Sequence, residues 1–194
     1  MHADTQTAAA DKHALWEQKL REMDVLRDTV GTGIDPGIRE TVAVLQLLGV
    51  HTRQSCEGHM DHGIAAPWVD LESADPRVLV FRRVYAALGK KADTREDAGR
   101  EPVAIYEKMH AVSNAINQIE AVAYKKLMPY LEEFYHGRTV SCEQRLLIDH
   151  RGRLTCQGAL LQPAEAKEAQ AVRLHVYQQE MRAFTEFLKR KFFS

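Results

Sequence analysis

The chain has 194 residues, with 45% hydrophobic and 27% charged residues, and its 26 basic and 27 acidic residues leave a net charge of −1. A chain of this length usually folds as one domain with a sizeable core. The balanced charge argues against a dedicated nucleic-acid binder, because such proteins carry a basic excess on one face. We expect a single domain over residues 11–194. Residues 1–10 are small and polar without an apolar period, which predicts a mobile N-terminal tail.

The sequence predicts a cytoplasmic protein without a membrane partner. No apolar run approaches the roughly 18 residues that cross a bilayer, and the first residues lack the basic-then-apolar order of a signal peptide. Cys56, Cys142 and Cys156 are an odd number of cysteines scattered over the chain. This favours reduced thiols over a disulfide framework.

The first half predicts three helices and two strands. Apolar residues at three- and four-residue steps from Trp16 to Val30 indicate a helix that begins after Asp11. Asp35-Pro36 supplies a capping carboxylate and a first-turn proline for a second helix, which ends at Gly49. Short strands are expected over residues 50–56 and 68–71. A third helix follows Asp75-Pro76 and ends at Gly89.

The second half predicts a long helix, a β-hairpin and a final helix. Residues 90–101 indicate an exposed loop, and we expect Pro129 to kink or break the helix that Pro102 opens. Alternating apolar residues over 138–159 predict the hairpin. The last helix, after Pro163, has an apolar stripe that indicates core or an oligomer interface, with Phe192 and Phe193 as contacts for a partner subunit. Six residues form this stripe: Leu174, Tyr177, Met181, Phe184, Leu188 and Phe192.

These elements predict an α+β fold that is mostly helical, with long helices packed on a small mixed four-stranded sheet. The two halves also resemble each other, because Ser55-Cys56-Glu57 and Ser141-Cys142-Glu143 each follow a helix and a glycine. This match suggests an α-β-β-α pseudo-repeat.

Reactive residue types concentrate between Ser55 and Gly63, in a segment too short and polar to be core. The end of a strand followed by a glycine turn is a common place for a ligand site, because backbone N–H groups are free there. Three readings fit this loop. In the first, Cys56, His59 and His62 bind a metal such as zinc. The fourth ligand would then come from one of four residues: His51, Asp61, Cys142 or Cys156.

In the second reading, Cys56 is a nucleophile activated by an imidazole, with Glu57 as acid or orienting group and Arg53 nearby to lower the thiol pKa. In the third, Glu57 and His59 bind a polar ligand while Cys56 only packs. Against all three stands an ordinary structural role, with a buried cysteine, a turn glycine and solvated histidines.

The run from Leu47 to His59, followed by Pro67-Trp68-Val69, resembles a pattern in uncharacterised bacterial and phage proteins: a helix, a glycine, T-x-x-S-C-E-G-H and an aromatic-containing strand. It is more distantly similar to the tRNA wybutosine-synthesis methyltransferase family, which carries Ser-Cys-Ser-Gly-Arg at a comparable place. Glu57 and His59 replace the second serine and the arginine of that run. The resemblance therefore implies a site at this loop and a mixed α/β fold, and does not extend to S-adenosylmethionine or tRNA.

A second polar cluster surrounds the predicted hairpin. If the hairpin lies beside the first strand pair, its arginines and Arg53 are placed to recognise phosphate or carboxylate; a solvated strand face is the alternative. The cluster consists of six residues: His136, Arg138, Arg145, His150, Arg151 and Arg153.

The sequence thus predicts a small-ligand-binding or catalytic domain. Cys56, Glu57 and His59 are the candidate catalytic residues, and Arg53, His62 and Trp68 the supporting ligand-binding residues. The alternative is a non-enzymatic interaction or regulatory module in which a metal organises the loop. The expected partners are a small molecule and a second copy of the chain. Neither a membrane nor a nucleic acid is expected.

Overall fold

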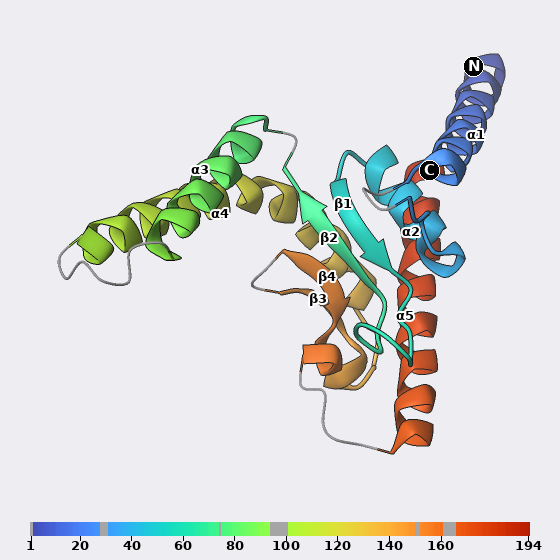
Figure 1. Ribbon diagram of the computed structural model, residues 1–194. Coiled ribbons are helices and arrows are strands. Elements are labelled where there is room, and N and C mark those ends of the chain that lie inside the picture. Colours follow the sequence, from blue (N-terminus) through green and yellow to red (C-terminus); the bar gives the residue numbers. More distant parts are fainter. Residues whose placement is uncertain (1, 28–30, 74, 94–100, 150–151, 161–165) are drawn as a thin grey trace.

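The computed structural model describes residues 2–27, 31–73, 75–93, 101–149, 152–160 and 166–194. Long helices pack around a small four-stranded sheet, so the predicted, mostly helical α+β class is confirmed (Figure 1). All three strand pairings are antiparallel, which corrects the prediction of a mixed sheet.

The helices are α1 (His2–Val25), α2 (Pro36–Leu47), α3 (Arg77–Asp93), α4 (Glu101–Tyr135) and α5 (Lys167–Phe193). The strands are β1 (His51–Cys56), β2 (Trp68–Glu72), β3 (Leu146–Ile148) and β4 (Arg153–Cys156). Two 3₁₀ turns, η1 (Cys142–Gln144) and η2 (Gln157–Leu160), flank the second hairpin.

The sheet consists of two hairpins in the order β1-β2-β4-β3, which makes β1 and β3 its edges. Val69 and Leu71 of β2 and Leu154 and Cys156 of β4 are buried in the core. Helix α4 contacts β2 and β3, and helix α2 contacts β1 and α5. Strand β1 has no buried residue and pairs only with β2 in the sheet, so its outer edge is not covered by another described strand.

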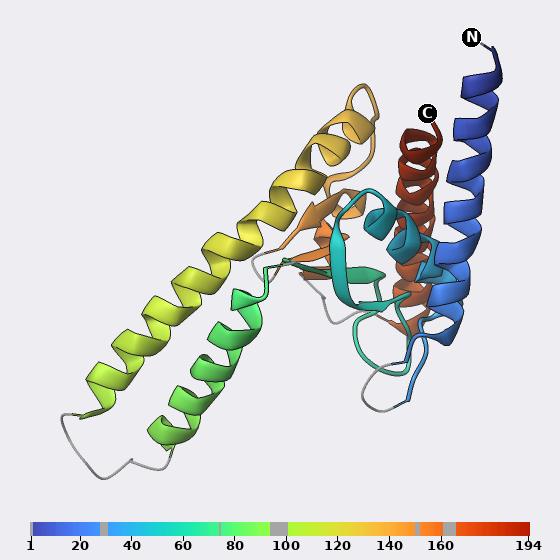
Figure 2. The ribbon, with the colours of Figure 1, turned by 90° about the horizontal axis from the view of Figure 1, so that it is seen from above.

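Helix α5 fills the centre of the core, because five residues of its predicted stripe are buried: Leu174, Tyr177, Met181, Phe184 and Leu188. Its C-terminal end lies beside α1 (Figure 2). The Phe193 ring is 4.7 Å from the His13 ring and 6.2 Å from the Trp16 ring, measured between centroids. Contacts within the chain therefore cover part of the terminal aromatic pair, and its role in a subunit contact remains a prediction.

Helix α4 continues through Pro129, so of the predicted kink or break the break is wrong, whereas the kink stays a prediction. Leu127, Leu131 and Phe134 are all buried around this proline, and their packing offsets the lost backbone hydrogen bond. Helix α1 begins at His2 and not after Asp11, whereas the mobility of residues 1–10 remains a prediction. Helix α1 ends at Val25, earlier than predicted, and Val30, the last residue of the predicted apolar stripe, lies outside the described residues.

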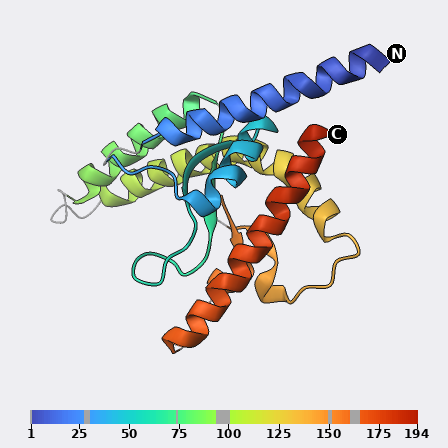
Figure 3. The same ribbon diagram turned by 90° about the vertical axis from the view of Figure 1, so that its right-hand side faces the viewer.

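Helices α3 and α4 form a hairpin that projects away from the sheet, as seen from above in Figure 2 and from the side in Figure 3. Four of its apolar side chains are more than half exposed: Leu79, Val80, Tyr106 and Val122. In the described part of the chain, no helix has the length and apolar character needed to span a membrane.

The two Ser-Cys-Glu segments occupy different positions in the fold. Cys56 is the last residue of β1, whereas Cys142 and Glu143 form the 3₁₀ turn that precedes β3. Strands β1 and β3 are the two edges of the sheet, and the described elements α2-β1-β2-α3 and α4-β3-β4-α5 repeat the predicted α-β-β-α order. The predicted hairpin therefore begins later than residue 138, because Cys142 and Glu143 form a 3₁₀ turn and β3 starts at Leu146.

Candidate functional site

Two carboxylates have exchanged roles at the start of α2. Asp35 occupies the N-cap position but its side chain makes no capping hydrogen bond, contrary to the sequence prediction. Glu57, which lies 20 residues beyond Gly37, instead accepts a hydrogen bond at Oε2 from the Gly37 N–H, at 2.6 Å. A side chain at residue 37 would collide with Glu57, because an added Cβ would lie 2.6 Å from Oε2. The capping function of Glu57 leaves Asp35 available for other contacts.

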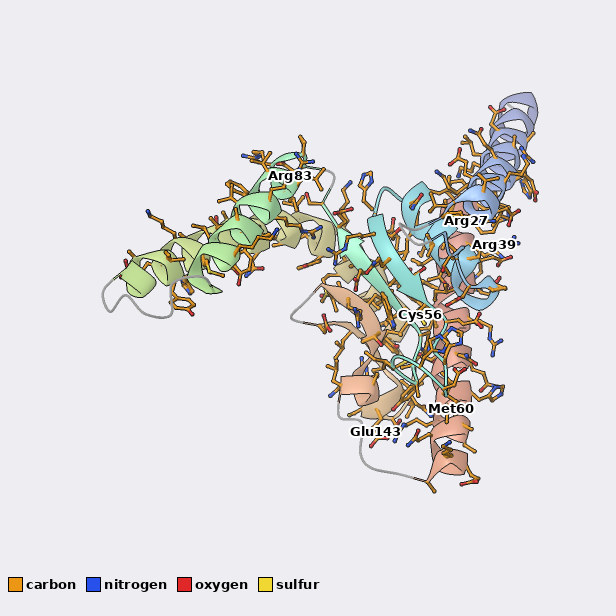
Figure 4. The ribbon with its side chains drawn as sticks, in the orientation of Figure 1. Arg27, Arg39, Cys56, Met60, Arg83 and Glu143 are labelled. Carbon is orange, nitrogen blue, oxygen red and sulfur yellow. The ribbon has the colours of Figure 1, made fainter. Side chains whose placement is uncertain are left out.

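Asp35 faces the end of β1, where it meets Cys56 and His59. Its Oδ2 accepts a hydrogen bond from the Glu57 N–H at 3.0 Å and lies 3.2 Å from His59 Nε2. One donor atom from each of Asp35, Cys56 and His59 lies within 4.8 Å of the other two. Figure 4 shows Cys56 at the end of β1, below the junction of α1 and α2 where Arg27 lies. These three side chains come from two segments that are distant in sequence.

The local environment favours charge on Asp35 and disfavours it on Cys56. Burial acts to raise the pKa of Asp35, but hydrogen bonds from the Glu57 N–H and His59 outweigh it, so the pKa is lowered. Burial raises the pKa of the Cys56 thiol; the Gly58 N–H, 3.3 Å from Sγ, opposes this, and the Asp35 and Glu57 carboxylates add to it. A thiol with a raised pKa is mostly protonated at neutral pH and is a poor nucleophile.

The order of the three groups also differs from that of a nucleophilic triad. In such a triad the imidazole stands between the nucleophile and the carboxylate, so that one ring nitrogen serves each. Here the carboxylate of Asp35 interacts with both the thiol of Cys56 and the imidazole of His59. This convergence does not support the activated Cys56 that the second reading requires.

A groove of about 610 Å³ runs along β1 and contains the donor cluster at one end. Five consecutive residues, Thr52–Cys56, line it. The alternation of side chains along β1 is interrupted by a register shift between Thr52 and Gln54, and Trp68 and Glu72 of the paired strand β2 also line the groove. The facing wall includes Thr32–Asp35 and residues Val42 and Gln46 of α2.

Four of the predicted residues gather with Cys56 and Asp35 in this groove: Arg53, His59, His62 and Trp68. The rings of His59 and His62 are stacked, with centroids 4.3 Å apart. The Glu57 side chain points elsewhere, into a smaller cavity of about 170 Å³ that Gly37 and Gln178 also line. The contacts of Glu57 are those of a structural residue, and its catalytic role stays a prediction.

The sequence predicts a metal site made of Cys56, His59 and His62. The structure instead forms two groups of potential metal ligands, and both groups contain His59. One joins His59 to Asp35 and Cys56, and the other joins it to Asp61 and His62. The remaining candidates for a fourth ligand belong to neither group among the described residues. His51 lines a separate cavity, Cys142 is exposed in η1, and Cys156 is buried in β4.

The predicted arginine cluster is only partly assembled. Arg53 Nη2 and Arg153 Nε lie 3.2 and 2.8 Å from the two oxygens of the buried Asp70 carboxylate. The Arg153 guanidinium also stacks 3.9 Å above the Trp68 ring. Arg138 and Arg145 instead lie beside the aromatic ring of Tyr135.

His136 is exposed at the end of α4, and His150 and Arg151 lie outside the described residues. Arg53 lines the groove, and Arg153, a described member of the cluster, adjoins it through its contacts with Asp70 and Trp68.

Gly58 fixes the path of the chain after β1. Its φ is +87°, and an added Cβ would lie 2.6 Å from the carbonyl carbon of Ala66 and 2.7 Å from Leu174 Cδ1. The Gln178 amide of α5 donates to the Glu57 carbonyl at 3.0 Å, which anchors the same turn. The loop that carries His59 is thus held against α5 by close packing and a hydrogen bond.

Sequence reasoning missed Asp35 as a site residue, because Asp-Pro before an apolar helix is the usual signal for a capped N-terminus. The available signal was a second carboxylate, Glu57, that could provide the same cap.

The chain was compared with known protein families, curated proteins and solved structures, and it matches none of them.

Proposed function

We propose that the groove beside β1 binds a small anionic molecule and that any chemistry takes place at its Cys56 and His59 end. The observation that carries this proposal is the convergence of Arg53, Cys56, His59, His62 and Trp68 on one groove of about 610 Å³. Pockets of this size, with a few convergent polar groups, are typical of small-molecule sites.

The charges around Asp70 favour an anion. Beside Trp68, the Asp70 carboxylate pairs with two guanidiniums, those of Arg53 and Arg153. The acidic residues that line the groove itself are Asp35 and Glu72. The Arg53 side chain is 44% exposed, so its guanidinium has donors free for a ligand. A carboxylate or phosphate at this place would receive charge-assisted hydrogen bonds.

Binding can be tested on the full chain by NMR, with inorganic phosphate and succinate as separate probes. We expect shifts at the Trp68 indole and in residues of β1. Arg53→Met should weaken binding about tenfold or more, since hydrogen bonds to a charged group contribute roughly 1.5–3 kcal/mol. Arg83→Met is the matched control, because Arg83 lies on the projecting hairpin (Figure 4). Shifts absent from the groove with both probes, or equal effects of the two substitutions, would contradict the proposal.

The alternative is a non-enzymatic interaction module, which the exposed apolar side chains Leu79, Val80, Tyr106 and Val122 of the α3–α4 hairpin favour. On this alternative, the polar groups near β1 stabilise the fold only. The Arg53→Met variant would then lose stability, and neither anion would shift the groove resonances.

A further inference from the structure

We propose that Asp35, Cys56 and His59 bind a divalent transition metal, with zinc as the best match, and that the metal has an open coordination position toward the groove. The part of this inference that concerns the open coordination position rests on the proposed function. The metal site itself stands on the arrangement of the three side chains.

The donor types and their spacing fit zinc. Thiolate, imidazole and carboxylate are its usual protein ligands, with bond lengths of about 2.0–2.3 Å, which places neighbouring donors of a tetrahedron about 3.3–3.8 Å apart. The three donor atoms already lie within 4.8 Å of one another, so small side-chain movements suffice to close the site. Soft thiolate ligation disfavours magnesium and calcium, which prefer all-oxygen sites.

Surrounding groups are positioned to support the anionic ligands. The Glu57 N–H donates to Asp35 Oδ2 at 3.0 Å, and the Gly58 N–H lies 3.3 Å from Cys56 Sγ. Hydrogen bonds of this kind orient ligands and stabilise their charge. When the metal binds, the Cys56 thiol proton passes to solvent, and the metal replaces the hydrogen bond between Asp35 and His59. One carboxylate and one thiolate then neutralise the two charges of the ion.

Three protein ligands leave the fourth position of a tetrahedral ion to water or to a bound molecule, as is usual for catalytic zinc. All three ligands line the 610 Å³ groove, so that position opens toward the proposed anion site. Arg53 borders the same groove, so a bound anion and the metal would share one cavity. A metal there would supply the chemical role that the proposed function otherwise lacks.

The test is titration of the chelator-treated full chain with Zn²⁺ and, separately, with Co²⁺, which gives a thiolate charge-transfer absorption when cysteine is a ligand. We expect one equivalent of metal, with Asp35→Asn, Cys56→Ser and His59→Gln each weakening binding at least tenfold. Cys142→Ser is the matched control for loss of a thiol and should bind as the wild type does. Circular dichroism confirms that each variant is folded.

Absence of stoichiometric metal, or wild-type affinity in Asp35→Asn, would overturn this ligand set. His62→Gln tests the ligand set predicted from the sequence. A large loss of metal affinity in His62→Gln, with none in Asp35→Asn, would identify His62 and not Asp35 as the third ligand. Metal binding without groove shifts from phosphate or succinate would reject the proposed function alone. Anion binding to a chain that takes up no metal would reject the metal site alone.

Discussion

Glu57 shows how one side chain can organise a site without lining it. Its carboxylate caps α2 through the Gly37 N–H, while its own N–H donates to Asp35. The N-terminus of a helix has unpaired N–H groups, and one carboxylate is sufficient as a cap. Because Glu57 fills this role, Asp35 can turn toward Cys56 and His59.

Replacing Glu57 therefore tests a structural role. We expect Glu57→Ala to lower the free energy of unfolding by about 1 kcal/mol, the usual value of an N-cap, as measured by urea denaturation. Glu57→Gln keeps an oxygen acceptor and should recover part of this loss. Glu17→Ala, at an exposed position of α1, should have little effect. Unchanged stability in Glu57→Ala would contradict the capping role.

Gly58 and Gly63 form a matched pair in the same loop. Both have positive φ, +87° and +71°, but only at Gly58 would an added Cβ collide with neighbouring atoms. We expect Gly63→Ala to cost about 1–2 kcal/mol for its backbone conformation. Gly58→Ala should cost a further 1–3 kcal/mol, roughly, for overpacking against Ala66 and Leu174. Equal losses in thermal or urea unfolding would show that the loop moves to accommodate the methyl group.

The three thiols should differ in reactivity. Cys142 is exposed, Cys56 is partly buried with a raised pKa, and Cys156 is buried with a pKa raised further, first by desolvation. Because the thiolate is the reactive species, iodoacetamide at pH 7.5 should modify Cys142 first and Cys156 last in metal-free protein. Mass spectrometry of the alkylated peptides measures the order. Fastest modification at Cys56 would restore the nucleophile hypothesis.

Among the elements, α4 is joined to α5 and β3 by a buried polar cluster. The Tyr135 hydroxyl donates to Glu180 Oε1 at 3.0 Å and accepts the Leu146 N–H at 2.7 Å. Arg138 pairs with the same carboxylate at 2.9 Å. A single hydroxyl therefore connects a helix end, the central helix and the first residue of an edge strand.

Tyr135→Phe should lower the free energy of unfolding by about 1–3 kcal/mol, because the buried Leu146 N–H and Glu180 each lose a partner. Chemical denaturation measures this loss. Tyr130→Phe on the same helix serves as the control, since Tyr130 is only partly buried. Equal losses in the two variants would indicate that the hydroxyl contributes little beyond packing.

At the scale of the whole molecule, the α3–α4 hairpin is packed differently from the rest. Among the described side chains of α3, a single apolar one is buried, that of Val78. In α5, by contrast, five are buried: Leu174, Tyr177, Met181, Phe184 and Leu188. Stability is lower where fewer apolar side chains are buried.

Hydrogen exchange should therefore be faster in α3 and the first half of α4 than in α2 and α5. Peptide-level mass spectrometry of the metal-free chain provides the measurement. Uniform protection over the hairpin would mean that another molecule covers it. Light scattering on the same sample would then test the predicted homo-oligomer, for which the exposed hairpin is a surface of suitable character.

The sequence by itself determined the class of fold and the order of its helices and hairpins, and it predicted a site at the segment after β1. These follow from local signals: apolar period, glycine and proline stops, and a concentration of reactive side chains. Only the tertiary structure decided that the sheet is antiparallel, that α4 passes through Pro129, and that Asp35 exchanges roles with Glu57. Such outcomes depend on packing and hydrogen bonds between segments distant in the chain, which no local pattern encodes. The donor set of Asp35, Cys56 and His59 exists because α2 and the end of β1 meet in space.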